Sequence, residues 1–284
     1  MVARTESVGV IGSGIMATGI AEVVGRSGIA AIVRARSQSS ADASRAQLVG
    51  ALQRQVSKGK ITGDEERRIL ANVRFVTELT DLADCDIVIE SVVEDLNTKQ
   101  VLFRELDAVA KPSAILATNT STLPVVEMAR VVRQPERVCG IHFFNPASVL
   151  PLVEVVRPIT ASDDTIERAN AFVAAIGKER VSVLDRAGFI VNALLFPYLN
   201  NAIRMLEEGT ASMEDIDTAM KGGCNFPMGP FALLDLVGLD TALSILETLH
   251  ASFGDTNFAP RPMLRQLVSQ GRLGRKTKAG FYVY

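Results

Sequence analysis

Several residue types are scarce in this chain, and their scarcity argues against some classes of protein. There is no tryptophan, aromatic residues make up 5% of the 284 positions, and there are two histidines and three cysteines. The cysteines are odd in number and lack CxxC spacing, so we expect neither a disulfide framework nor a metal site. The net charge of −2 and the few aromatic side chains argue against nucleic acid as a partner.

Long apolar segments and targeting signals are scarce too. The first residues lack the charged-then-apolar pattern of a signal peptide. No run reaches the roughly 18 apolar residues that a membrane span needs. Together with the cysteine pattern, this predicts a protein of the reducing cytoplasm that does not enter a membrane.

The chain does contain a repeated alternation of short apolar runs and helical patterns. The runs are β-branched and do not alternate with polar residues, which is typical of parallel strands covered on both faces. Helical patterns at 17–26, 97–110 and 164–176 separate them, so we predict an α/β fold with a doubly wound, mainly parallel Rossmann-type sheet. The expected strands are residues 8–11, 30–33, 87–90, 115–118, 138–143, 153–156 and 181–184.

Two further regions depart from this alternation. Residues 37–72 are too long for a simple crossover and have a helical composition, which predicts a helical hairpin that protrudes from the sheet. After residue 185 the strand pattern fades, which predicts a smaller all-α domain over 186–284 behind a sheet domain over 1–185. A helix expected at 189–207 is apolar nearly all round, and we therefore expect a homodimer through this second domain.

A glycine-rich turn follows the first expected strand. Gly12 permits the tight turn, Gly14 lets the backbone approach a pyrophosphate, and Ala17 keeps helix and strand close. The helix start, with Ile15 and Met16, presents backbone N–H groups to a phosphate. By itself the motif could be a structural turn. Its position inside a βαβ pattern predicts a dinucleotide site in the domain 1–185.

The second expected strand does not end in the acidic residue that usually binds the ribose hydroxyls of NAD. The sequence there is Arg34-Ala35-Arg36-Ser37, which suits a 2′-phosphate instead. We therefore favour NADP(H) over NAD(H) and assign Arg34 and Arg36 to the cofactor site. The alternative is that both arginines are solvated ends of a strand and that other groups bind NAD.

Four polar residues have the chemistry needed to oxidise an alcohol. His142 could take the hydroxyl proton, and Glu154 could fix the tautomer of the ring and make its other nitrogen a stronger base. Ser121 and Asn192 could grip the substrate oxygens and polarise a carbonyl. Each residue also has a structural explanation: a satisfied core histidine, a solvated glutamate, a turn serine and a helix-cap asparagine.

These motifs resemble the L-3-hydroxyacyl-CoA dehydrogenase family, and most closely its small bacterial 3-hydroxybutyryl-CoA type. The matching features are the glycine turn, Ser121, the segment GIHFFNP around His142, Glu154 and Asn192. The resemblance extends from residue 8 to residue 284. It implies reversible oxidation of short-chain (S)-3-hydroxyacyl-CoA to 3-oxoacyl-CoA, a reaction of fatty acid metabolism.

The resemblance also assigns residues that spacing alone would leave as solvated charges. It gives Ser121 contacts with both the cofactor and the substrate, and it places Glu94, Lys99 and Asn145 on the nicotinamide side of the cofactor. It also makes Lys276 a contact of the cofactor. In the hairpin 37–72 it places Lys58 at a phosphate of CoA, although Ala51 stands where the family often has a hydroxyl residue.

Two other functions remain open from the sequence. One is a related two-domain dehydrogenase that acts on a free hydroxy acid or sugar acid; the basic side chains of the hairpin disfavour it. The other is a non-catalytic dinucleotide-binding protein, which would have no need for His142 and Glu154 as a pair.

Overall fold

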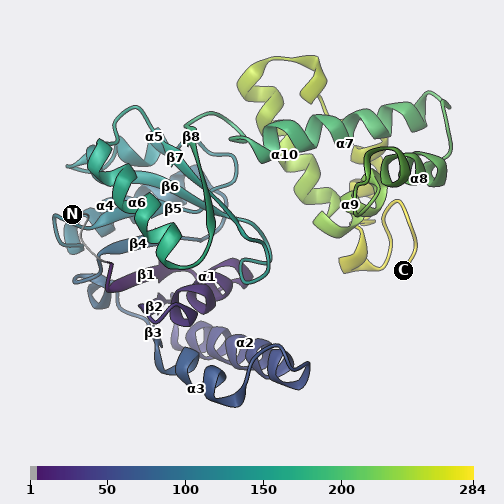
Figure 1. The fold of residues 1–284 in the computed structure, drawn as a ribbon. Coiled ribbons are helices and arrows are strands. Elements are labelled where there is room, and N and C mark those ends of the chain that lie inside the picture. Colours follow the sequence, from purple (N-terminus) through teal and green to yellow (C-terminus); the bar gives the residue numbers. More distant parts are fainter. Residues whose placement is uncertain (1–4) are drawn as a thin grey trace. The chain divides into compact units, whose positions relative to one another are not determined.

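A single sheet of eight strands forms the centre of the first part of the chain (Figure 1). The structure, a computed structural model, describes residues 5–284. The strands are β1 (Ser7–Ile11), β2 (Ala30–Arg34), β3 (Val73–Val76), β4 (Ile87–Glu90), β5 (Ile115–Thr118), β6 (Val138–Phe143), β7 (Leu152–Arg157) and β8 (Glu179–Leu184). Their order is β3-β2-β1-β4-β5-β6-β7-β8, and only the β6–β7 pair is antiparallel.

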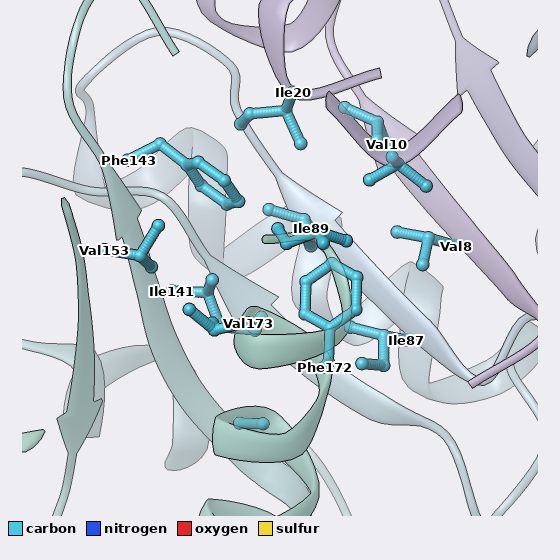
Figure 2. Packing of buried hydrophobic residues seen from close by; sticks show 14 of the residues in the cluster. Val8, Val10, Ile20, Ile87, Ile89, Ile141, Phe143, Val153, Phe172 and Val173 are labelled. Carbon is cyan, nitrogen blue, oxygen red and sulfur yellow. The ribbon is translucent and has the colours of Figure 1, made fainter. Parts of the chain in front are cut away.

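Helices connect these strands and cover the sheet. Those of the first part are α1 (Ile15–Arg26), α2 (Gln38–Ser57), α3 (Gly63–Ala71), α4 (Leu96–Val109), α5 (Val125–Ala129) and α6 (Asp163–Ala175). α1 and α6 share one buried apolar core with the sheet, in which Ile20 and Phe172 face Val10, Ile89 and Ile141 (Figure 2). α1 and α4 join strands in opposite directions along the sheet, and right-handed crossovers therefore place them on opposite faces.

The predicted fold class is confirmed, and the sequence analysis missed one strand and one α-helix. β3 was missed because it is a short edge strand whose residues are only partly buried, so it lacks a continuous apolar run. α5 was missed because its five residues are too few for a helical period. The other strands lie within a few residues of their expected positions.

The long connection after β2 forms two helices, α2 and α3, with a small core of their own. Leu48 and Leu52 of α2 are buried against Ile69 of α3. Thr62 begins α3 with a capping box, since its side chain accepts from the Glu65 N–H and the Glu65 carboxylate accepts from the Thr62 N–H.

The chain divides into two compact units, Met1–Asp185 and Arg186–Tyr284. The second contains α7 (Val191–Glu207), α8 (Met213–Cys224), α9 (Pro230–Val237), α10 (Leu239–Phe253) and α11 (Pro262–Ser269), packed around an apolar core. Two buried carboxylates tie this unit together: Asp217 accepts from the Phe231 N–H at the start of α9, and Asp235 accepts from the Phe281 N–H. Within residues 5–284, no helix is both long and apolar enough to span a bilayer.

Candidate active site

The antiparallel pairing of β6 and β7 brings His142 directly opposite Glu154. Side chains opposite each other on neighbouring strands point to the same face of a sheet, which explains their contact. The His142 Nδ1 lies 2.8 Å from the Glu154 Oε2, and the two residues are 3% and 0% exposed. Glu154 therefore does not point to water, and the alternative explanation of a solvated glutamate does not hold. A carboxylate at Nδ1 favours the tautomer with the proton on that nitrogen, leaving the lone pair on Nε2.

The other ring nitrogen of His142 faces a serine from the loop after β5. The Ser121 Oγ lies 3.2 Å from the His142 Nε2. Phe144 packs against the imidazole, with ring centroids 4.5 Å apart. The first unit thus brings together Glu154, His142 and Ser121 in one hydrogen-bonded chain. This order resembles the carboxylate, imidazole and hydroxyl series used in proton transfer.

Glu94 holds the loop that carries Ser121. Its Oε1 accepts the backbone N–H of Ser121 at 2.9 Å and that of Thr122 at 3.3 Å, and it also accepts the hydroxyl of Thr120. Burial alone would raise the pKa of Glu94, but the Lys99 ammonium and these hydrogen bonds outweigh it and hold the pKa below its usual value. The carboxylate is therefore charged at neutral pH.

The glycine turn after β1 fits the phosphates of a dinucleotide. Gly12 has a φ of 135°, and a Cβ there would lie 2.3 Å from the carbonyl oxygen of Ser91. A Cβ on Gly14 would meet no atom within 4 Å, so the space in front of the helix is open. α1 has no side-chain cap and no acidic residue in its first turn. Its leading N–H groups therefore have both the room and the polarity for a phosphate.

The two arginines at the end of β2, Arg34 and Arg36, differ in their surroundings. The Arg34 Nε donates to the backbone carbonyl of Thr77 at 2.9 Å, so this side chain is partly committed to the fold. Ala35 is buried, whereas Arg36 is exposed. Ser37 begins α2 and accepts the N–H of Ser40. An exposed guanidinium beside an N-terminal helix turn is thus the main charged feature at this strand end.

Other expected site residues of the first unit lie on its surface. Asn145 is exposed in the turn that follows β6, three positions after His142. Lys58 is exposed at the C-terminal end of α2. Among residues 5–284, no group of three or more His, Cys, Asp or Glu side chains is arranged to hold a metal ion.

Two expected site residues belong to the second unit. Asn192 is buried in the first turn of α7, which follows Gly188 and Phe189, both with positive φ. Phe189 is a bulky residue in the left-handed region, so the entry to α7 is conformationally costly. Lys276 lies in a short 3-10 turn, and its Nζ is 2.6 Å from the Asp240 carboxylate.

The sequence analysis did not single out Glu90, and spacing alone left Lys99 as a solvated charge. Glu90 ends β4 and is fully buried, although it was counted only as part of an apolar strand. Lys99 is 1% exposed, in contrast to the solvated charge that spacing alone predicts. The one signal in the sequence that could have indicated a buried charge is the position of Glu90, a carboxylate at the end of an otherwise apolar strand.

Comparisons with known proteins match nearly the whole chain to one family. Residues 7–186 match the sequence profile of the 3-hydroxyacyl-CoA dehydrogenase NAD binding domain, and residues 188–284 match that of the C-terminal domain of the same family. A 3-hydroxybutyryl-CoA dehydrogenase of Mycobacterium tuberculosis is 46% identical over 281 residues, which covers 98% of each protein.

Solved structures give the same result. A crystal structure of M. tuberculosis FadB2 superposes with a TM-score of 0.98 at 45% identity and covers 99% of this chain and 100% of its own. The (S)-3-hydroxybutyryl-CoA dehydrogenase of Ralstonia eutropha superposes with a TM-score of 0.95 at 37% identity, covering 99% of both chains. With both domain profiles matched in order, this chain is an oxidoreductase that belongs to the 3-hydroxyacyl-CoA dehydrogenase family.

Proposed function

We propose that this enzyme interconverts short-chain (S)-3-hydroxyacyl-CoA and 3-oxoacyl-CoA, with 3-hydroxybutyryl-CoA and acetoacetyl-CoA as its substrate pair. The observation that carries the proposal is the buried His142–Glu154 pair with Ser121 at the second ring nitrogen. The relatives named as 3-hydroxybutyryl-CoA dehydrogenases support the choice of a short acyl chain.

The residues of the chain divide the chemistry among them. A bound nicotinamide cofactor supplies the hydride acceptor or donor. His142 takes the proton of the 3-hydroxyl group during oxidation and returns it during reduction. Glu154 orients the imidazole and stabilises the imidazolium that forms. Ser121 binds the reacting oxygen, so that in the reducing direction the 3-oxo carbonyl is polarised for hydride attack at C3, and Asn192 binds the thioester carbonyl.

The same proposal assigns the remaining family positions. The glycine turn and the start of α1 bind the pyrophosphate of the cofactor. Asn145 lies beside the nicotinamide and Lys276 contacts the cofactor, both by their match to the family. By the same match, Glu94 faces the nicotinamide side of the cofactor. It also holds the loop of Ser121, whose N–H it accepts.

NADP(H) is the proposed cofactor, because Ala35 removes the acid that would bind the ribose and Arg36 is exposed beside it. We expect Arg36→Gln to lower kcat/KM for NADPH about tenfold or more, the value of one charge-assisted hydrogen bond, and to leave kcat/KM for NADH unchanged. Arg45→Gln, an exposed arginine on α2, is the matched control. A wild-type enzyme that prefers NADH tenfold would contradict the proposal.

Lys58 is the proposed contact for a phosphate of CoA. We expect Lys58→Glu to raise the KM for acetoacetyl-CoA about tenfold, because a cation is replaced by an anion, while the KM for the cofactor stays the same. Acetoacetyl-pantetheine lacks the nucleotide phosphates, so its KM should not change in this variant. Arg67→Glu, the same charge reversal on α3, controls for the general field of the hairpin. Equal KM changes for both substrates would contradict the contact.

A homodimer through the second unit completes the proposal. α7 and its surroundings expose large apolar side chains that a partner copy would cover, among them Leu194, Ile190, Met205 and Phe226. Sedimentation equilibrium at micromolar concentration should give twice the mass of the chain; a monomer under these conditions would contradict the dimer.

One absorbance assay separates the proposed function from its alternatives. Acetoacetyl-CoA with NADPH or NADH should be reduced, as seen in the loss of nicotinamide absorbance, whereas free acetoacetate should not. Turnover of the free acid would favour a related hydroxy-acid dehydrogenase. Cofactor binding without turnover of either compound would favour a non-catalytic dinucleotide-binding protein.

A further inference from the structure

The carboxylate of Glu90 is fully buried at the end of β4, and both of its oxygens are engaged. Its Oε1 is 2.6 Å from the Nζ of Lys99 and also accepts the Val92 N–H at 2.7 Å. Its Oε2 accepts the hydroxyl of Thr118 at 2.7 Å. A charged group is buried only with such partners, since an unpaired buried charge is costly.

Lys99 lies between two carboxylates. Besides Glu90, its Nζ is 3.3 Å from the Oε2 of Glu94, and its side chain is 1% exposed. The buried ammonium fixes the position of Glu94, because its Nζ attracts that carboxylate at 3.3 Å, although the Glu94 side chain itself is 39% exposed.

Glu94 passes this constraint to the reacting residues. Its Oε1 accepts the Ser121 N–H, and the Ser121 Oγ in turn lies 3.2 Å from the His142 Nε2. A continuous series of contacts therefore runs from Glu90 through Lys99 and Glu94 to the proposed proton acceptor. No contact in this series is longer than 3.3 Å.

We propose that Glu90 is a positioning residue for the proposed dehydrogenase reaction: through Lys99 it fixes Glu94 and thereby the orientation of Ser121 toward His142. The inference rests on the proposed function. In this series Lys99 acts on the Ser121 loop through Glu94. In Glu90→Gln the ammonium keeps only Glu94 as a charged partner. Glu94 then moves toward Lys99 and releases the N–H groups of the Ser121 loop.

The first test compares Glu90→Gln with Glu22→Gln. Glu22 is a matched control, because it is also buried and paired with an arginine, Arg26, at 2.8 Å, but lies on α1 outside the series. We expect Glu90→Gln to lower kcat for acetoacetyl-CoA about 10–100-fold, as a displacement of about 1 Å does elsewhere, with little change in the KM for the cofactor. Glu22→Gln should change only the melting temperature. Equal kcat values in Glu90→Gln and wild type would overturn the inference.

A double-mutant cycle tests whether Glu90 acts through Lys99. Lys99→Met and Glu90→Gln/Lys99→Met should have similar kcat values, because removing Glu90 has no further effect once the ammonium is gone. Additive losses would show that Glu90 acts independently and would overturn the inference.

Hydrogen exchange gives a readout that does not depend on activity. Peptides containing the Ser121 and Thr122 amides should exchange faster in Glu90→Gln than in wild type or Glu22→Gln, since both amides donate to Glu94. Unchanged exchange would count against the inference even if the substrate proves to be different. Should Glu90→Gln fail to fold, Glu90→Asp withdraws the carboxylate from the Lys99 Nζ and should produce the same faster exchange. If the wild type does not reduce acetoacetyl-CoA but Glu90→Gln still exchanges faster than the wild type, the proposed function is contradicted and the positioning contact remains supported.

Discussion

Replacing His142 by glutamine should reduce kcat for acetoacetyl-CoA reduction about 10²–10⁴-fold, the contribution typical of a general acid or base. The KM values should change little, because Gly12, Gly14 and Lys58 are untouched. Glutamine is the preferred replacement, since its amide can still donate a hydrogen bond toward Glu154, whereas alanine would remove a donor from a fully buried carboxylate.

The second histidine of the chain provides the control. His250 lies on α10, and its Nδ1 is 3.0 Å from the backbone carbonyl of Asp255. His250→Gln makes the same chemical change outside the proposed site and should leave kcat and both KM values at the wild-type level. Similar losses in both variants would mean that the loss reflects folding. A His142→Gln enzyme within threefold of wild type would contradict a proton-transfer role for His142.

Glu154→Gln should lower kcat by about 100-fold or more, because a neutral amide neither stabilises an imidazolium nor fixes the tautomer of His142. Glutamate and glutamine have nearly the same shape, so the packing of the β6–β7 pair should persist in this variant. The effect should therefore fall on kcat and much less on the melting temperature or on cofactor affinity. Steady-state kinetics and thermal unfolding of the same preparation separate these quantities.

An exposed glutamate of the same sheet serves as the comparison for Glu154. Glu179 begins β8 and faces solvent. Glu179→Gln should behave like the wild type in every measurement. Combining Glu154→Gln with His142→Gln should cost little more than His142→Gln alone, since the two residues act as one unit. Independent, additive losses would contradict that coupling.

Much of the fold could be predicted from the sequence because its signals are local. The apolar runs of β1, β4 and β5 and the glycine turn with Gly12 depend on near neighbours in the chain. The pairing of His142 with Glu154 required one further step, the antiparallel return of β7 after the turn near Pro146. The residue types and family pattern made that pairing a natural hypothesis, and the register in the structure places the two side chains together.

The Glu90 network could not be predicted in the same way. Lys99 occupies a helix start where a charge usually meets water, yet it is buried beside the Glu90 carboxylate of β4. Burial of a charged group depends on partners from distant positions, here Glu90 and Thr118, which no local period indicates. The same reason explains why the partial commitment of Arg34 to Thr77 was not foreseen.

The most direct test of the central claim is a crystal structure of the enzyme with oxidised cofactor and acetoacetyl-CoA. The 3-oxo oxygen should lie within hydrogen-bonding distance of both the Nε2 of His142 and the Oγ of Ser121, with the C4 of the nicotinamide facing the C3 of the substrate. A thioester bound elsewhere, or a nicotinamide ring far from His142, would contradict the account.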